Sequence, residues 1–157
     1  MAAVGLSIVE LLGVVAILAI LLTMGAGFLR TDRTSVSQAA QGLSSQIQRA
    51  RLEAIRRNTF AGVCFSNTGS GSYSLRTASL ATGVCPSGTL ITEIRMGQDT
   101  LGQVRLSNEG GSGFSGIVFN SRGMVSGVAT TTVTLRNAAN NFSKQVVVNP
   151  QGRASVQ

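Results

Sequence analysis

The chain has 157 residues, of which 43% are hydrophobic and 12% are charged, and its formal net charge is +7. This length, with one long hydrophobic run, leaves room for a single compact domain of modest core. Histidine is absent, which excludes Ser-His and Cys-His nucleophile pairs, and two cysteines cannot supply the ligands of a zinc site. The six acidic residues are scattered singly. We therefore expect a protein that is not an enzyme and that needs no metal or cofactor.

Residues 6–29 form a hydrophobic run with no proline and one charged residue, Glu10. As a helix this run is about 36 Å long, which exceeds the roughly 30 Å of a bilayer core, so it predicts a transmembrane helix. A carboxylate in lipid costs roughly 2.5 to 3.5 kcal/mol. We therefore expect Glu10 to be functional and to require a cationic partner.

A cleaved secretory signal peptide is the alternative interpretation of this run. Gly25, Ala26 and Gly27 form a small-x-small site, and cleavage there would release a secreted domain, for example a hydrolase, that begins near Phe28. Against it, residues 1–5 carry no Lys or Arg, and a signal peptide has a shorter apolar core of about 7 to 15 residues. The chain also lacks recognisable catalytic residues.

The run opens with a short motif, Gly5-Leu6-Ser7-Ile8-Val9-Glu10. This motif resembles that of the type IV pilin-like proteins, which include pilins and the pseudopilins of type II secretion. The resemblance implies that residues 1–5 are a leader, that a prepilin peptidase cuts between Gly5 and Leu6, and that the Leu6 amine is methylated. A charged Leu6 amine of one subunit can neutralise Glu10 of its neighbour, so the buried carboxylate is tolerated only when helices associate.

The same resemblance implies where the protein is found and what it contacts. The chain would first span the bacterial inner membrane once, with its head in the periplasm, and then enter a pilus or pseudopilus. Its partners would be other pilin or pseudopilin subunits, the peptidase and the membrane. The sequence leaves open whether the filament serves type IV pili, competence or type II secretion.

Residues 30–57 predict an amphipathic helix that ends near Asn58. Its apolar stripe consists of Val36, Ala40, Leu43, Ile47, Ala50 and Ala54. Four cations, Arg49, Arg51, Arg56 and Arg57, fall near its end, where they complement the helix dipole. A solvated face is the favoured interpretation of these cations, and contact with DNA is the alternative.

In residues 58–157, apolar and polar residues alternate over short runs, as they do in β-strands, and clusters of Gly, Ser and Asn separate these runs. The predicted strands are 60–66, 72–78, 90–96, 103–107, 116–120, 131–136 and 145–149. We expect an α+β fold, in which an antiparallel sheet or sandwich packs on the apolar stripe of the helix. Cys64 and Cys85 are favoured to form a disulfide that closes a loop of about 20 residues, and two free buried thiols are the alternative.

The C-terminal part contains three ordered motifs, Gly116-Ile117-Val118-Phe119-Asn120-Ser121-Arg122-Gly123, Thr132-Val133-Thr134-Leu135 and Val146-Val147-Val148-Asn149-Pro150-Gln151-Gly152-Arg153. Over about the final 40 residues they resemble the GspH/FimT family of minor pilins and pseudopilins. Some members of that family are associated with DNA uptake through a basic tail, which here begins with Arg153 and has Ser155 in place of a second arginine.

This resemblance makes DNA binding the alternative function. Arg153 on a mobile terminus, with Arg122 and Lys144 near it in the folded head, would contact phosphates of double-stranded DNA without reading its sequence. The chain has one tyrosine and no tryptophan, so stacking on single-stranded bases is not expected.

Overall fold

The computed structural model describes residues 8–26, 31–66, 71–85, 87–96, 104–107, 115–127, 130–139 and 141–157. The chain divides into two compact units, Met1–Thr31 and Asp32–Gln157. The predicted cleavage site between Gly5 and Leu6, with the methylated Leu6, lies outside the described residues, and so do the residues between the two helices.

The first unit contains helix α1, Ile8–Ala26, which carries Glu10 in its first turn. Its leucine- and alanine-rich sequence without proline explains the helix. Over the described part of the chain, we find no helix whose length and apolar character suffice for a bilayer crossing. The predicted span of 6–29 extends past this helix at both ends and stays a prediction.

Helix α2, Thr31–Arg57, belongs to the second unit except for its first residue. Every residue of the predicted stripe, from Val36 to Ala54, is fully buried. The helix ends at Asn58, which has a φ of 50°. There the backbone N–H of Asn58 donates to the Ile55 carbonyl at 3.2 Å and that of Thr59 donates to the Ala54 carbonyl at 3.1 Å. These two bonds form a Schellman cap, which satisfies two carbonyls of the last turn.

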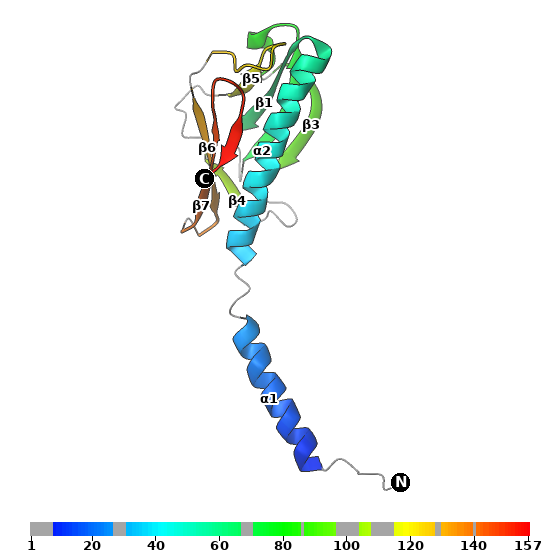
Figure 1. Cartoon of the computed structure of the whole chain (residues 1–157), viewed down its shortest axis with the longest axis vertical. Helices are drawn as coiled ribbons and strands as arrows, with labels where there is room; N and C mark the ends of the chain where they lie inside the picture. Colours follow the sequence, from blue (N-terminus) through cyan, green and yellow to red (C-terminus); the bar gives the residue numbers. More distant parts are fainter. Residues whose placement is uncertain are drawn as a thin grey trace, which may run out of the picture. The chain divides into compact units, whose positions relative to one another are not determined.

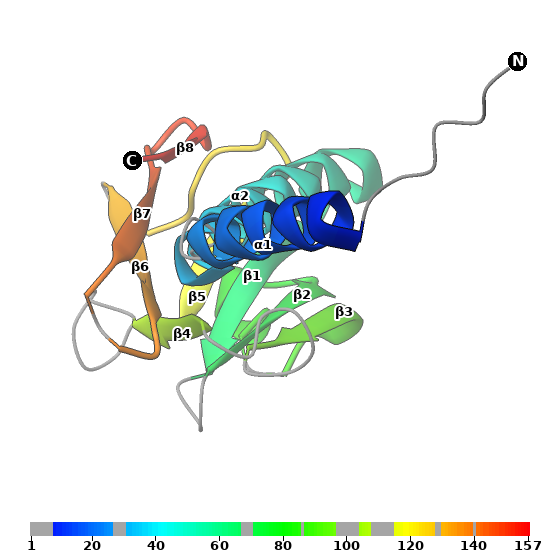
Figure 2. The same ribbon diagram turned by 90° about the horizontal axis from the view of Figure 1, so that it is seen from below.

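In the described residues after α2, eight strands form two antiparallel sheets (Figures 1 and 2). The first sheet has the order β3-β2-β1-β5, and the second has the order β4-β6-β7-β8. Their bounds are β1 Phe60–Ser66, β2 Ser72–Ala78, β3 Thr89–Arg95, β4 Val104–Ser107, β5 Gly116–Phe119, β6 Thr131–Asn137, β7 Ser143–Val148 and β8 Ala154–Val156. All seven predicted strands are present with small shifts at their ends, and β8 is an additional strand.

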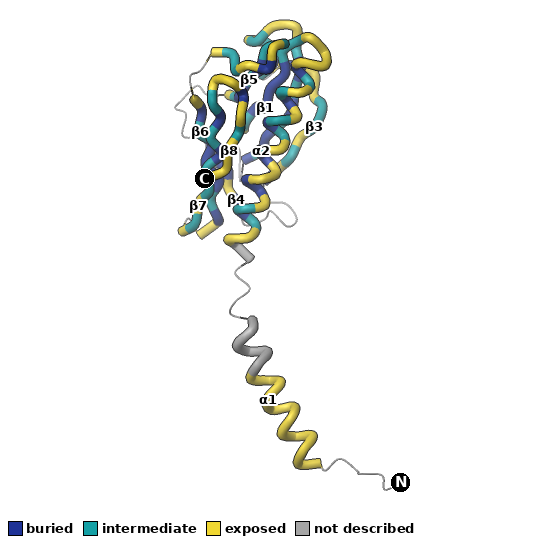
Figure 3. Tube along the Cα trace, viewed as in Figure 1, coloured by how far each residue is buried: buried dark blue, intermediate teal, exposed yellow. Residues whose placement is uncertain are grey.

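One hydrophobic core joins α2 to both sheets. Figure 3 shows buried positions along α2 and along the strands β1, β6 and β7. The largest fully buried side chains include Phe119 of β5, Leu43 and Ile47 of α2, and Leu135 of β6. The α+β fold, with a helix packed on antiparallel sheet, is confirmed.

A disulfide joins Cys64 of β1 to Cys85, which follows the short 3-10 helix η1, Ala81–Gly83. The two Cα atoms are 5.6 Å apart, within the usual range for a disulfide. Gly116 of β5 lies against this bridge, because a Cβ added there would be 2.7 Å from the Cys85 sulfur and 2.5 Å from the Val63 carbonyl oxygen. The favoured pairing is therefore present, and it requires a glycine in the neighbouring strand.

Candidate functional site

Glu10 is surrounded in sequence by aliphatic residues whose side chains are exposed. Ile8 and Val9 precede it and Leu11 and Leu12 follow it, and each is more than half exposed. Glu10 is the one ionisable residue in the sequence of α1. The helix therefore has no cation of its own to neutralise Glu10 when its apolar surface is removed from water, and the counter-charge must come from outside α1.

The head carries a turn, residues 120–124, that is built around an asparagine. The Asn120 side-chain oxygen accepts hydrogen bonds from the backbone N–H groups of Arg122 and Met124, at 3.0 and 3.1 Å. The Gly123 N–H donates to the Asn120 carbonyl at 2.8 Å, and Gly123 has a φ of 75°. This geometry leaves the Arg122 side chain exposed at the surface.

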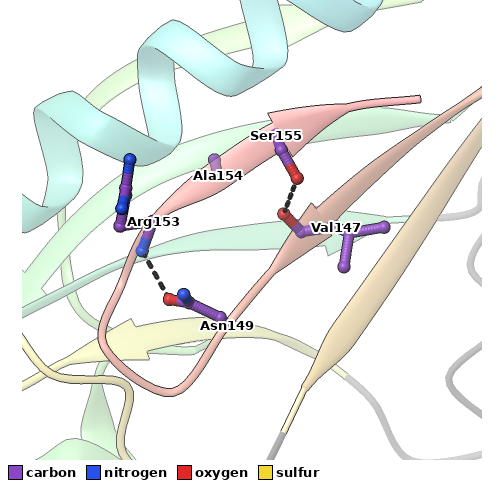
Figure 4. A pocket seen from close by; sticks show the side chains of 5 residues that line it. All are labelled: Val147, Asn149, Arg153, Ala154 and Ser155. Carbon is purple, nitrogen blue, oxygen red and sulfur yellow. Dashed lines mark hydrogen bonds between the residues drawn. The ribbon is translucent and has the colours of Figure 1, made fainter.

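A second turn of the same design spans residues 149–153. The Asn149 side-chain oxygen accepts from the Arg153 N–H at 2.9 Å (Figure 4). The Gly152 N–H donates to the Asn149 carbonyl at 2.9 Å. Gly152 also has a positive φ, 79°. The turn leads directly into β8, which pairs with β7. The expectation of a mobile terminus is therefore wrong, because backbone pairing orders the chain after Arg153.

The two turns adjoin each other at Arg51 of α2. The Arg51 Nε donates to the Gly123 carbonyl at 3.0 Å, and the Val125 N–H donates to the Pro150 carbonyl at 3.0 Å. A Cβ added to Gly152 would lie 2.6 Å from the Gly123 carbonyl oxygen and 3.2 Å from the Arg51 side chain. The fold thus places the turns of Arg122 and Arg153 side by side, although thirty residues of sequence separate the two arginines.

Lys144 does not belong to this group. It lies near the start of β7, opposite the buried Leu135 of β6. Asn149 lies five positions further along the strand, which corresponds to about 17 Å. The expectation that Lys144 is close to the two arginines is wrong, because the extended strand carries it away from the turns.

A small pocket of about 240 Å³ adjoins the second turn (Figure 4). Its lining residues are Val147, Asn149, Arg153, Ala154 and Ser155. The Ser155 hydroxyl donates to the Val147 carbonyl at 3.4 Å, a long hydrogen bond. Figure 4 shows the Arg153 side chain directed away from Asn149 and Ser155, and the lining residues include no base to activate the serine.

The end of α2 is rich in cations that are partly neutralised. Glu53 accepts hydrogen bonds from the guanidinium groups of Arg56, at 3.1 Å, and of Arg57. Burial by itself would raise the pKa of the Glu53 carboxyl, but the hydrogen bonds from Arg57 and Arg56 hold this pKa below its usual value. Arg49 is exposed on the same helix. The solvated face expected from the sequence is present at Arg49, Arg56 and Arg57.

Sequence reasoning missed the role of Arg51, which it grouped with the cations that complement the helix dipole. A signal for the turns was present, because Asn-Ser-Arg-Gly at 120–123 and Asn-Pro-Gln-Gly at 149–152 share an asparagine followed by a glycine three residues later. The contact of both turns with Arg51 depends on how α2 packs against the sheets, so no short sequence motif predicts it.

A hydrophobic helix followed by a helix packed on antiparallel sheets defines the class of pilin-like subunits. The family model described as Type II transport protein GspH matches residues 39–152. The chain is 35% identical to Pilin-like protein PilA1 of Thermus thermophilus over 154 residues, which cover 98% of this chain and 97% of that protein. The chain therefore belongs to the GspH family of pilin-like proteins.

Two solved structures share this fold at low sequence identity. The type IV minor pilin FimU of Pseudomonas aeruginosa has a TM-score of 0.59 at 16% identity, over 81% of this chain and 91% of that chain. The minor pseudopilin EpsH from the Type 2 Secretion System of Vibrio cholerae has a TM-score of 0.55 at 15% identity, over 78% of this chain and 96% of that chain.

Proposed function

We propose that the chain is a non-enzymatic minor structural subunit of a type IV pilus, competence or type II secretion filament. Assembly follows cleavage between Gly5 and Leu6 by a prepilin peptidase and methylation of the new amine. The observation that carries this proposal is Glu10, the one ionisable residue of an apolar helix. A salt bridge between Glu10 and the Leu6 amine of a neighbouring subunit neutralises both charges when the helices pack together.

The proposal includes a membrane-anchored stage before assembly. In that stage the N-terminal segment holds the chain in the bacterial inner membrane, with its head in the periplasm. The aliphatic side chains exposed along residues 8–20 support an apolar environment for α1. The disulfide between Cys64 and Cys85 fits a head that folds in an oxidising compartment.

Replacing Glu10 tests the assembly step. For Glu10→Ala we expect the amount of chain recovered in sheared filaments to fall at least about tenfold, because an uncompensated buried amine costs several kcal/mol and about 1.4 kcal/mol corresponds to a factor of ten. Immunoblotting of sheared filaments and of the cell fraction measures this ratio.

The matched control is Glu93→Ala, which removes an exposed carboxylate of β3 that pairs with Arg95. This variant should enter filaments normally. Mass spectrometry of the native chain should find N-methylated Leu6 at the N-terminus. A mature chain that begins near Phe28, or unchanged recovery of the Glu10 variant, would refute the proposal.

A second candidate function is the binding of double-stranded DNA. It is favoured by one observation, the two adjoining turns that present Arg122 and Arg153 at the surface. Such arginines can contact phosphates without reading bases. Tyr73, the one tyrosine, is buried in the core and offers no stacking surface.

The double variant Arg122→Ala, Arg153→Ala tests this candidate. If both arginines contact phosphates, the slope of log K against log salt becomes shallower by about 1.8, since each contact contributes about 0.9. Fluorescence anisotropy of a labelled duplex across a salt series measures the slope. The control is Lys144→Ala, which removes a cation distant from the turns and should leave the slope unchanged. Equal slopes for the double variant and the native chain would exclude these contacts.

A further inference from the structure

The C-terminal end of α2 carries exposed aliphatic side chains on its solvent side. Leu52 is 65% exposed and Ile55 is 45% exposed, and residues three apart are neighbours on a helix surface. Met124, which is 43% exposed, follows Gly123, and a Cβ added to Gly123 would lie 2.8 Å from the terminal carbon of Ile55. We call Leu52, Ile55 and Met124 the apolar patch.

Arginines surround this patch along the helix. Arg49 is three residues before Leu52 and Arg56 is four residues after it, while Arg51 is four residues before Ile55. These spacings place each arginine next to a patch residue on the helix surface. The patch therefore combines an aliphatic centre with a margin of solvated arginines, and an apolar centre with a polar rim is the usual arrangement of a protein-binding surface.

Carboxylates are scarce at this margin. In the described part of α2, Glu53 is the one acidic side chain near the patch, and Arg56 and Arg57 both donate to it. Arg122, in the turn that ends at Met124, adds a further exposed cation. The margin is therefore positive overall, and it complements a surface that carries carboxylates.

We propose that the apolar patch docks a different filament subunit, through a surface on that subunit where aliphatic side chains are flanked by Asp or Glu. This inference rests on the proposed function, because it assumes that the chain enters a filament. Charge decides between the possible partners. In a filament a second copy of this chain would meet the patch with a different face, but that copy has the same net charge of +7, so the two chains repel each other. DNA would match the margin but not the aliphatic centre.

Site-specific photo-cross-linking in filament-producing cells tests the proposal. The full chain carries a photoreactive amino acid in place of Leu52, and in a matched control in place of Leu90, an exposed aliphatic residue of β3. We expect Leu52 to give a cross-link to a different pilin-like subunit, at a peptide that contains both aliphatic and acidic residues, with a severalfold higher yield than Leu90. Mass spectrometry of the cross-linked peptide identifies the partner and the position.

A pair of charge variants checks that the patch itself is responsible. With the cross-linker in place of Met124, Leu52→Glu should reduce the yield severalfold, because a carboxylate repels the acidic partner, whereas Leu90→Glu should not. Both positions are exposed, so we expect each variant to shift the melting temperature by less than about 3 °C.

Three results would overturn the proposal, namely a cross-link mainly to a second copy of this chain, a nuclease-sensitive cross-link to DNA, and equal yields from Leu52 and Leu90. If the chain is present in sheared filaments with methylated Leu6 while one of these results is obtained, the docking proposal fails and the filament role stands. Absence of the chain from filaments refutes the filament role, and the docking proposal with it.

Discussion

Arg51 shows how one side chain can organise a surface that is distant in sequence. Its guanidinium reaches from α2 to the Gly123 carbonyl, and its aliphatic stem lies against Gly152. Gly123 is buried, and the Arg51 side chain is part of what covers it. The order of both arginine-bearing turns therefore depends on a residue that contributes no exposed charge of its own to either turn.

We expect Arg51→Met to lower the free energy of unfolding by about 1.5 to 3 kcal/mol, the usual contribution of a hydrogen bond to a charged group. Methionine keeps part of the aliphatic stem and removes the donor. Urea denaturation of the detergent-solubilised chain, followed by circular dichroism, measures the change. Arg49→Met, which alters an exposed arginine of the same helix, should stay within about 0.5 kcal/mol of the native chain. Similar losses for the two variants would contradict the assigned role.

At the scale of elements, helix α2 and the strands are explained by different regularities of the sequence. Apolar residues three and four positions apart predicted the buried stripe of α2, and all six predicted positions are fully buried. Alternation predicted seven strands. It missed β8, Ala154–Val156, because three residues are too few to show a period of two. The pairing of β8 with β7 depends on the turn at Asn149 and on the neighbouring strand.

The stripe makes a quantitative prediction for α2. Ile47→Ala should destabilise the head by about 2 to 5 kcal/mol, because it removes a fully buried side chain and leaves a cavity between α2 and the sheets. The same denaturation experiment measures it. Leu52→Ala, on the exposed side of the same helix, should change the stability by no more than about 0.5 kcal/mol. A small effect at Ile47 would show that the stripe does not carry the packing.

For the whole molecule, charge is divided unevenly along the chain. The sequence of α1 contains Glu10 as its one ionisable residue, while all thirteen Lys and Arg residues and the other five acidic residues lie from Arg30 onward. The family match over residues 39–152 falls within the second unit, and the similarity to PilA1 of Thermus thermophilus extends over nearly the whole chain. The chain thus combines a head that matches the family model with an apolar helix whose sequence contains a single acidic residue.

The sequence alone was enough to predict the α+β class, the buried face of α2, the end of that helix at Asn58 and seven of the strands. These features depend on residues that are close together in the chain. The spacing of apolar residues and the residue that caps the helix are therefore enough to predict them. The tertiary structure decided the order of the strands in two sheets, the closeness of Arg122 to Arg153 and the separation of Lys144 from both. Those relations depend on contacts between residues far apart in sequence, which follow from the packing of the helix and both sheets around one core.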